Sequence, residues 1–228
     1  MSARPFDTIV VVGVGLIGGS FAAAVRRLAD PPRVLGVEPD AEARRYAVRE
    51  GIVDEALGAD AAVDAGWFAG CGRETLVLLA APVKGVEAWL ERLGSLGFGG
   101  VVSDAASTKS GVFSVAAAKL SPKAEFIGGH PMAGSERSGV TAADPDLFRD
   151  AYYVLTPSET SDADAYRQVH ALVSSLGARV IAVAPALHDE AVAAVSHVPH
   201  VAASALTNLA AQRAGDGREV LRLAAGGF

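Results

Sequence analysis

The chain has 228 residues, of which 50% are hydrophobic and 20% are charged, with 20 basic and 26 acidic side chains and a formal net charge of −6. A composition this apolar and this sparsely charged describes one or two globular domains and excludes an intrinsically disordered chain. The Lys and Arg residues are interleaved with acidic ones, so a small-molecule ligand is expected, with neither a nucleic acid nor a membrane as partner.

Short apolar runs alternate with helical patterns from residue 8 to residue 183. Strands are predicted at residues 8–12, 33–38, 75–80, 101–103, 125–128, 152–156 and 179–183, and helices at residues 15–28, 40–50, 83–96, 109–120 and 162–176. Uninterrupted apolar runs such as residues 76–79 are typical of strands that helices cover on both faces. The alternation therefore predicts an α/β fold with a doubly wound parallel sheet of the Rossmann type.

This alternation stops near Pro185, which divides the chain into two predicted domains. Residues 1–184 are predicted to form a Rossmann-type dinucleotide-binding domain, and residues 185–228 a helical one that begins at a turn over residues 187–190. The second segment is too short to close a hydrophobic core of its own, so we expect it to be an incomplete helical domain.

Cysteine usage and the first residues favour a cytoplasmic location. Cys71 is the single cysteine, so neither an internal disulfide nor a cysteine-based metal site is expected. The amino-terminal segment lacks the basic and apolar parts of a signal peptide. The longest uncharged stretch, residues 191–212, contains two histidines and a proline, which favours a helix buried in a soluble domain or in an interface over a membrane span.

A glycine-rich segment at residues 13–18 reads Gly-Val-Gly-Leu-Ile-Gly, and it leaves the first predicted strand to open the first predicted helix. This context is typical of dinucleotide-binding folds. Gly13 permits a tight turn, Gly15 lets the backbone approach a pyrophosphate at the helix N-terminus, and Gly18 allows the helix to pack closely on the strand. The alternative is a tight turn that binds no ligand. The predicted cofactor-binding residues of this loop are Gly13, Gly15, Leu16, Ile17 and Gly18.

Glu38 lies at the end of the second predicted strand, 20 residues after Gly18. An acidic residue at this position accepts hydrogen bonds from the ribose hydroxyls of a dinucleotide. Its carboxylate would repel a 2′-phosphate, and Arg44 and Arg45, the nearest arginines in the following sequence, are a turn and a half further on. NAD is therefore predicted as the cofactor in preference to NADP.

Two further strand ends carry candidate residues. Ala80 and Pro82 are small or rigid and would leave room for a flat nicotinamide, although packing explains them equally well. Ser107 follows the strand at residues 101–103, and polar residues at the carboxyl end of a parallel strand face the ligand crevice. Ser107 is predicted to bind the substrate or His130, and the alternative is that it only caps the next helix.

His130 lies in the segment Gly-Gly-His-Pro, just after the strand predicted at residues 125–128. The residue before a proline is driven out of the helical region, so His130 is expected on a rigid, extended turn. Histidine titrates near neutral pH and is the commonest general base, which makes His130 the predicted acceptor of a proton from a substrate hydroxyl. A structural histidine bonded to a backbone carbonyl is the alternative.

The remaining histidines are His170, His188, His197 and His200, and the last two are three residues apart on one predicted helical face. No carboxylate or cysteine stands at a matching spacing near them, so no metal site is expected. At least one of these C-terminal histidines is expected to bind an anionic substrate, and burial for structural reasons stays open for His188 and His200.

The order of several motifs resembles the prephenate dehydrogenase family, which includes arogenate dehydrogenases. The motifs extend over essentially the whole chain, and GGHPMAGSERSG and SHVPH are far more specific than the glycine loop. In chain order they are GVGLIGGS, LAAPV, DAASTKSG, GGHPMAGSERSG, LHDEAVAAVSHVPH and AAGGF.

This resemblance implies NAD-dependent oxidative decarboxylation of prephenate to 4-hydroxyphenylpyruvate, on the route to tyrosine. It implies that His130 bonds the ring C4 hydroxyl while hydride passes from C4 to the nicotinamide, and that Ser107 assists at that hydroxyl. It further implies that Ser135 and Glu136 shape and gate the substrate pocket and that His197 lines it. The C-terminal helices would belong to a dimerisation domain, which makes a homodimer the expected assembly.

One departure from the family bears on activity. In the family an arginine that binds the substrate carboxylate follows the Gly-Gly-Phe segment, whereas this sequence ends at Phe228. A buried carboxylate without a cation is costly, so this polypeptide is expected to bind NAD better than substrate and to turn over weakly. Arogenate oxidation to tyrosine and a truncated NAD-binding module with little activity are the alternatives.

Overall fold

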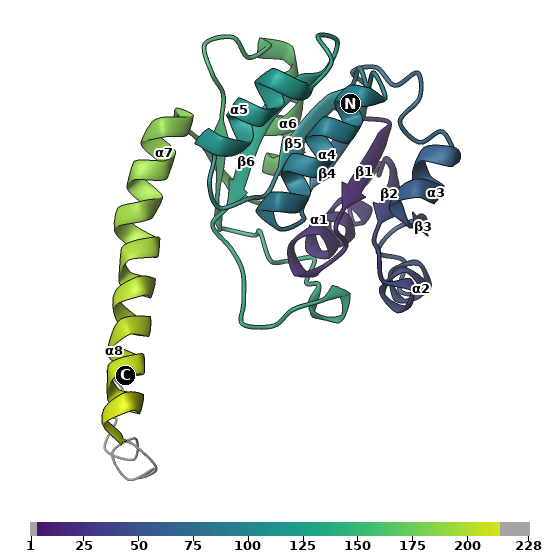
Figure 1. Ribbon diagram of the computed structural model, residues 1–228. Helices are drawn as coiled ribbons and strands as arrows, with labels where there is room; N and C mark the ends of the chain where they lie inside the picture. The colour runs from purple at the N-terminus through teal and green to yellow at the C-terminus, as the bar shows by residue number, and fades with distance from the viewer. Residues whose placement is uncertain (1–3, 215–228) are drawn as a thin grey trace. The chain divides into compact units, whose positions relative to one another are not determined.

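The computed structural model describes residues 4–214 (Figure 1). Its elements alternate between strands and helices up to residue 182, and only helical segments follow. In chain order they are β1 (Thr8–Val12), α1 (Leu16–Arg26), β2 (Arg33–Val37), α2 (Ala41–Arg49), β3 (Glu55–Leu57), α3 (Ala59–Asp64), β4 (Thr75–Leu79), α4 (Val83–Ser95), β5 (Val101–Asp104), α5 (Ser110–Lys119), β6 (Glu125–Pro131), the short 3₁₀ turn η1 (Val140–Ala142), β7 (Tyr152–Thr156), α6 (Ala163–Ser175), β8 (Arg179–Ala182), α7 (Pro185–Val192), the π-helical turn η2 (Ala193–His197) and α8 (Val198–Ala214).

The strands form one sheet in the order β3-β2-β1-β4-β5-β6-β7-β8. Six of its seven strand pairs are parallel, which confirms the predicted α/β fold with a parallel-dominated, doubly wound sheet. The pair of β6 and β7 is antiparallel, so the predicted parallel arrangement does not extend to this one pair. No α-helix connects these two strands along the sequence. A chain that leaves the sheet at the end of one strand and returns at that same end runs antiparallel in the next strand.

Two hydrophobic layers enclose the sheet. Side chains alternate along β1, so that Ile9 and Val11 belong to the layer under α1 and α6, whereas Val10 and Val12 belong to the layer under α4 and α5. α4 and α5 lie side by side on their face of the sheet (Figure 1). Burial on both faces explains why the inner strands appear in the sequence as unbroken apolar runs.

Three short elements were not predicted, namely β3, α3 and η1. The strand β3 and the 3₁₀ turn have three residues each, and α3 has six. Elements this short show too few repeats of a hydrophobic period to be recognised in a sequence. β3 is held by its parallel register with β2, in which Leu35 pairs with Glu55, and only the folded sheet supplies that partner.

The chain divides between Ala186 and Leu187 into two compact units, and the boundary expected near residue 184 remains a prediction. Residues 187–190, predicted as a turn, lie within α7, so that prediction is wrong: the run has no glycine or proline to stop the helix that begins at Pro185. Exposed apolar side chains lie on η2 and α8. These side chains are Val195, Val198, Val201, Leu206 and Leu209.

No helix in residues 4–214 is both long enough and apolar enough to cross a membrane.

Asp162 begins α6, as the sequence predicts, and accepts hydrogen bonds from the N–H groups of Asp164 and Ala165 at 3.0 and 2.8 Å. It also receives a hydrogen bond from the Arg73 guanidinium, which lies just before β4. The Arg73 bond, and after it the Ala165 N–H, lowers the pKa of Asp162 from 3.8 to about 2. One carboxylate therefore caps a helix and ties it to the neighbouring part of the sheet.

Acid titration tests this contact. A carboxyl whose pKa is lower in the folded state stabilises the fold above its unfolded pKa, and that contribution is lost as the pH falls. We therefore expect the free energy of unfolding to fall from about pH 4 towards about pH 2, and Asp162→Asn to weaken this dependence, since the amide keeps a capping oxygen but no charge. Chemical denaturation at several pH values measures the effect. Asp164→Asn, whose partner Arg167 forms an exposed ion pair, is the control, and an equal change in both variants would contradict the assignment.

Candidate functional site

The strand order places a crevice where the chain turns to opposite sides of the sheet. β1 lies between β2 and β4, so the connections from β1 and β4 run away from each other at the carboxyl ends of these strands. Ligands of doubly wound folds bind at such a switch point. The N–H of Gly13 bonds the Val37 carbonyl and the N–H of Ala80 bonds the Val12 carbonyl, each at 2.8 Å. The glycine loop and the segment from Ala80 to Pro82 therefore meet there.

The three glycines of the loop differ in what the fold requires of them. Gly13 has φ +89°, and a Cβ at this residue would lie 2.7 Å from the Ala80 carbonyl oxygen. A Cβ at Gly18 would lie 2.0 Å from the carbonyl oxygen of Gly13. A Cβ at Gly15, in contrast, would meet nothing within 4 Å. The fold therefore accounts for Gly13 and Gly18, whereas Gly15 leaves open space in front of the N-terminus of α1.

Two cavities of about 400 Å³ each adjoin this loop. They share four residues, Gly15, Ala80, Ala81 and Pro82. The glycine-loop cavity is further lined by Val12, Gly13, Val37, Glu38, Pro39, Ala59, Gly85 and Trp89. The Ser107 cavity is further lined by Leu16, Ile17, Val83, Ala105, Ala106, Ser107, Arg137, Ser138 and Gly139. The structure thus brings together, around one crevice, eight of the residues that the sequence singled out: Gly13, Gly15, Leu16, Ile17, Glu38, Ala80, Pro82 and Ser107.

Glu38 is held in place by the main chain around it. Its Oε2 accepts the N–H of Val14 at 3.0 Å, and its Oε1 accepts the N–H of Asp40 at 3.1 Å. Arg44, a turn and a half further along the sequence, nevertheless contacts this segment, because its Nη1 donates to the carbonyls of Glu38 and Pro39, at 2.7 Å each. The long side chain reaches back from the first turn of α2, which spacing along the sequence did not reveal.

His130 lies inside β6, paired with Val154 of β7, and not on a turn after the strand. The strand continues because its backbone is extended, as expected before Pro131, and because β7 supplies a partner along it. His130 is half-buried and lines neither of the two cavities. Ser107 is exposed on the loop between β5 and α5. The helix α5 begins after Lys109 and has no side-chain cap, so the capping alternative for Ser107 is wrong.

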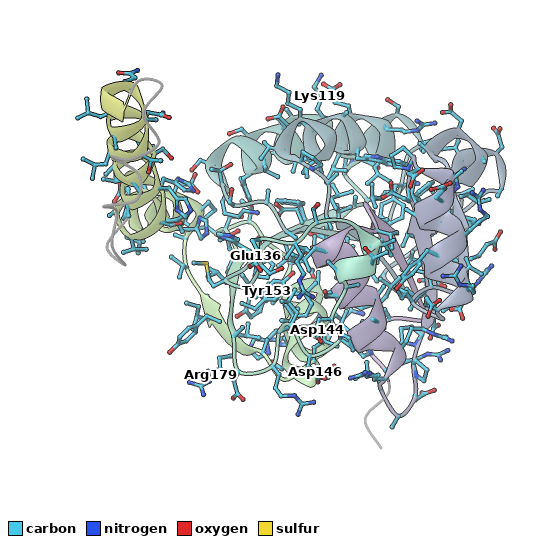
Figure 2. All side chains as sticks on the ribbon, turned by 90° about the horizontal axis from the view of Figure 1, so that it is seen from below. Lys119, Glu136, Asp144, Asp146, Tyr153 and Arg179 are labelled. Carbon is cyan, nitrogen blue, oxygen red and sulfur yellow. The ribbon has the colours of Figure 1, made fainter. Side chains whose placement is uncertain are left out.

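The other predicted substrate-binding residues lie in two places. Ser135 and Glu136 are exposed on the loop after β6, where Ser135 Oγ accepts the N–H of Arg137 at 3.2 Å. Glu136 is labelled in Figure 2. His197 ends η2 in the second compact unit. The segment that ends at Phe228 lies outside the described residues.

Sequence reasoning missed Arg137 and Ser138, which line the Ser107 cavity, and Trp89, which lines the glycine-loop cavity. Arg137 is exposed and brings a positive charge to the cavity that contains the N-terminus of α1. The sequence signal for Arg137 was its place directly after the Ser135-Glu136 pair, as a basic residue that could bind an anionic ligand. It could not be recognised because the contact joins segments that lie more than a hundred residues apart.

A buried ion pair lies beneath the site. Asp104 at the end of β5 and Lys109 just before α5 are bonded to each other with almost no exposure to solvent. Burial raises the pKa of Asp104, and the charge and hydrogen bond of Lys109 oppose this rise. Burial and then the negative charge of Asp104 raise the pKa of Tyr153 on β7.

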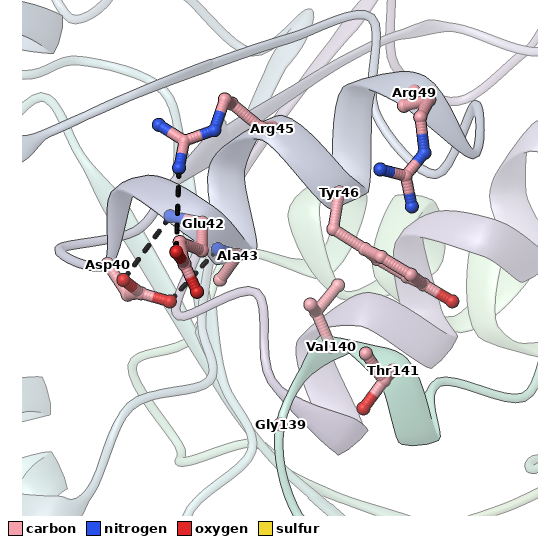
Figure 3. A pocket seen from close by; sticks show the side chains of 9 residues that line it. All are labelled: Asp40, Glu42, Ala43, Arg45, Tyr46, Arg49, Gly139, Val140 and Thr141. Atoms are coloured by element: carbon pink, nitrogen blue, oxygen red, sulfur yellow. Dashed lines mark hydrogen bonds and ion pairs between the residues drawn. The ribbon is translucent and has the colours of Figure 1, made fainter.

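A third cavity, of about 510 Å³, lies between α2 and the segment at residues 139–141 (Figure 3). It is the most spacious of the three, but it contains none of the predicted site residues. Its charged groups already have partners: Arg45 lies 3.8 Å from Glu42, and Arg49 lies over the Tyr46 ring at 5.2 Å. We therefore place the site at the glycine loop and not in this larger hollow.

Within residues 4–214, no group of three or more His, Cys, Asp or Glu side chains is arranged to hold a metal ion.

Comparison with known proteins assigns the chain to a family. Residues 21–182 match the family model described as "Prephenate dehydrogenase, nucleotide-binding domain", and residues 184–228 match the one described as "Prephenate dehydrogenase, dimerization domain". The chain belongs to the prephenate dehydrogenase family. The first match begins after the glycine loop, so the geometry of residues 13–18 supports nucleotide binding independently of that match.

Individual relatives support this family assignment. The chain is 35% identical over 224 residues to a prephenate dehydrogenase of Bacillus subtilis, covering 97% of this chain and 58% of the relative. A prephenate dehydrogenase of Aquifex aeolicus, solved in complex with hydroxyphenyl propionate and NAD+, superimposes with a TM-score of 0.87 at 29% identity, covering 100% of this chain and 76% of that one. An arogenate dehydrogenase of Synechocystis superimposes with a TM-score of 0.78 at 33% identity, covering 97% and 76%. The chain spans 58% of the length of the curated prephenate dehydrogenases of B. subtilis and Lactococcus lactis.

The contrast between Gly15 and Gly18 makes a prediction about stability. Gly18→Ala places a methyl group against the Gly13 carbonyl, and overpacking of this kind costs roughly 1–3 kcal/mol. Gly15→Ala meets open space, so its cost is limited to that of a poorer helix cap, at most about 1 kcal/mol. Thermal unfolding of both variants measures the difference. Equal losses would show that the fold itself requires glycine at residue 15.

Proposed function

We propose that this chain catalyses the NAD-dependent oxidative decarboxylation of prephenate to 4-hydroxyphenylpyruvate. The observation that carries the proposal is the unfilled space at Gly15, in a crevice that also holds Glu38 and Ser107, while His130 lies on the neighbouring strand of the sheet. Family membership and the Aquifex relative with NAD+ support the cofactor, and the hydroxyphenyl propionate bound to that relative supports a hydroxyphenyl product.

The residues of the crevice fit a dinucleotide. The N–H groups at the start of α1 face the space at Gly15, where a diphosphate would gain from the helix dipole, and Arg137 adds a positive charge to the same cavity. Glu38 would accept the ribose hydroxyls, and its charge opposes a 2′-phosphate. Arg44 Nη1 donates to main-chain carbonyls, whereas the Glu38 carboxylate accepts the N–H groups of Val14 and Asp40. Ala80 and Pro82 border the space proposed for the nicotinamide.

The proposed chemistry assigns a proton to His130. NAD+ supplies the acceptor for the hydride that leaves ring carbon C4. His130 holds the proton of the C4 hydroxyl as the C4–H bond breaks, and returns it to the phenolic oxygen when the bond from C1 to the carboxylate breaks. The electron pair of that bond completes the aromatic ring, and CO₂ leaves. Ser107 is proposed to bond the same hydroxyl, Ser135 and Glu136 to shape the pocket, and His197 to line it.

We also propose that the protein is a homodimer and that it is cytoplasmic. The match to a dimerization domain and the exposed apolar side chains of α8 support a homodimer. A small biosynthetic enzyme with a single cysteine fits the cytoplasm.

The test is the formation of NADH or NADPH by the purified protein with prephenate and with arogenate, each offered with NAD+ and with NADP+. Turnover of prephenate with NAD+ supports the proposal. Turnover of arogenate alone would replace the proposed substrate. Binding of NAD+ without turnover of either acid would contradict the proposed activity and leave a nucleotide-binding module. Absence of both binding and turnover would contradict the proposed cofactor as well.

Replacing His130 separates catalysis from cofactor binding. We expect His130→Asn to lower kcat by roughly 10²–10⁴-fold, since general acid–base catalysis contributes about that much. The Kd for NAD+ should stay within about threefold of the wild-type value, because His130 lines neither cavity at the glycine loop. Steady-state kinetics and calorimetry measure the two quantities. If the affinity for NAD+ fell as far as kcat, His130 would have a structural role.

Replacing Glu38 tests cofactor choice. Glu38→Ala should weaken NAD+ binding by roughly tenfold, about the contribution of one or two charged hydrogen bonds, and relieve the repulsion of NADP+. The ratio of the two Kd values should therefore shift towards NADP+. Glu42→Ala, an exposed carboxylate on α2 near the same strand end, is the matched control. An unchanged ratio for Glu38→Ala would remove the ribose assignment.

A further inference from the structure

The buried ion pair of Asp104 and Lys109 has no role in the mechanism described so far. The side chains are 0% and 1% exposed. Removing two charges from water is expensive, and well-packed apolar residues often stabilise a fold equally well or better. Stability is therefore a weak explanation for this pair, and the atoms that it contacts suggest another.

Both partners hold the residue that precedes His130. Asp104 Oδ1 accepts the N–H of Gly129 at 3.0 Å, and Lys109 Nζ donates to the Gly129 carbonyl at 2.6 Å. That carbonyl belongs to the peptide bond between Gly129 and His130. The main chain is thus fixed on both sides of Gly129, immediately before the proposed base.

The same pair also holds the loop that carries Ser107. Asp104 Oδ2 accepts the N–H of Ala106 at 3.0 Å, so the residue before Ser107 is bonded to the same carboxylate. Charge-assisted hydrogen bonds of this kind are shorter and stronger than neutral ones. One buried carboxylate therefore links the segments before both proposed catalytic residues.

Strand pairing does not supply this link. The parallel register of β5 and β6 ends with Ser103 opposite Ile127, two residues before Gly129. On its other side β6 remains paired with β7 as far as Pro131. The contacts of Asp104 and Lys109 take over where the ladder between β5 and β6 stops, on the side towards Ser107.

The glycines before His130 make room for this arrangement. A Cβ at Gly129 would lie 2.6 Å from the Asp104 carbonyl oxygen. A Cβ at Gly128 would lie 2.3 Å from Thr156 Oγ1 and 3.5 Å from Lys109 Cδ. Larger residues would push β6 away from β5 and from the ion pair.

We propose that Asp104 and Lys109 form a positioning pair, which fixes the main chain of His130 relative to the Ser107 loop. The inference rests on the proposed function, because it assigns the pair a role in the reaction of His130 and Ser107. A displacement of about 1 Å of a catalytic group lowers rates by up to roughly 10²-fold, so the pair is expected to act on kcat.

The decisive variant is the neutral double replacement Asp104→Asn with Lys109→Met. Lys109→Met alone leaves a buried carboxylate without its cation, and we expect both the thermal midpoint and kcat to fall. The double variant removes both charges at nearly constant volume, so its thermal midpoint should recover towards the wild-type value. Its kcat should remain roughly 10- to 100-fold low, because methionine offers no donor to the Gly129 carbonyl. The KM for NAD+ should stay within about threefold of wild type.

A donor should restore part of the rate. Asp104→Asn with Lys109→Gln places an amide N–H near the Gly129 carbonyl, and its kcat should exceed that of the Asn–Met variant by several-fold at a similar thermal midpoint. Thr156→Val is the matched control, since it removes a buried hydroxyl beside Gly128 that has no hydrogen-bond partner among the described residues. This control should keep the wild-type kcat. If the Asn–Met variant recovered both kcat and the thermal midpoint, the pair would only stabilise the fold, and the proposal would be overturned.

Amide hydrogen exchange gives a readout that does not depend on turnover. In the Asn–Met variant we expect faster exchange in residues 104–107 and 128–130, with β1 as an internal control that keeps wild-type protection. If the wild-type protein showed no turnover, the proposed function would be contradicted. The exchange rates of the Asn–Met variant and the wild type would still show whether the ion pair holds the segments before His130 and Ser107 together. Unchanged exchange in both segments would show that the pair does not hold them.

Discussion

The close approach of main chain at the carboxyl ends of β1 and β4 is the constraint on which the rest of the site depends. Gly13 can turn against the Ala80 carbonyl only because neither it nor Gly18 carries a Cβ. That contact sets the direction in which α1 leaves the sheet, and with it the space in front of Gly15. It also brings Ala80 and its neighbours to the border of both cavities. One short loop thus contains two glycines that the fold requires, Gly13 and Gly18, and one, Gly15, that borders open space.

The sequence predicted the regular part of the fold well, because burial on both faces of the sheet leaves a clear trace in residue type. The strand at Thr8–Val12 and the helices that start at Asp40 and Asp162 are found where they were expected. The direction of β7 was not predictable in this way, since the residues of a strand carry no mark of the neighbour with which it pairs. The same limit applies to His130, whose place inside a strand depends on β7 as its partner.

The composition of the site was more predictable than its contacts. Spacing along the chain identified Glu38 and Ser107, which lie where their strand ends suggested. Long flexible side chains were misjudged: Arg44 folds back on Glu38, and Arg137 reaches a cavity formed by distant segments. The buried charges of Asp104 and Lys109 belonged to a recognised motif, but only the folded chain shows that both contact Gly129. Sequence patterns report which chemistry is present, whereas the partners of long side chains depend on the fold.

The hydrogen bonds around Glu38 bear on how a ligand would be received. The N–H of Gly13 and the N–H of Val14 have acceptors within the chain itself, namely the Val37 carbonyl and the Glu38 carboxylate. The loop that leads into α1 is therefore preorganised. A dinucleotide that bound there would not have to order this loop first. Binding then loses little conformational entropy in the loop, so a larger share of the contact energy appears as affinity. Rigid docking of this kind also favours fast association, with differences in affinity expressed mainly in the rate of release.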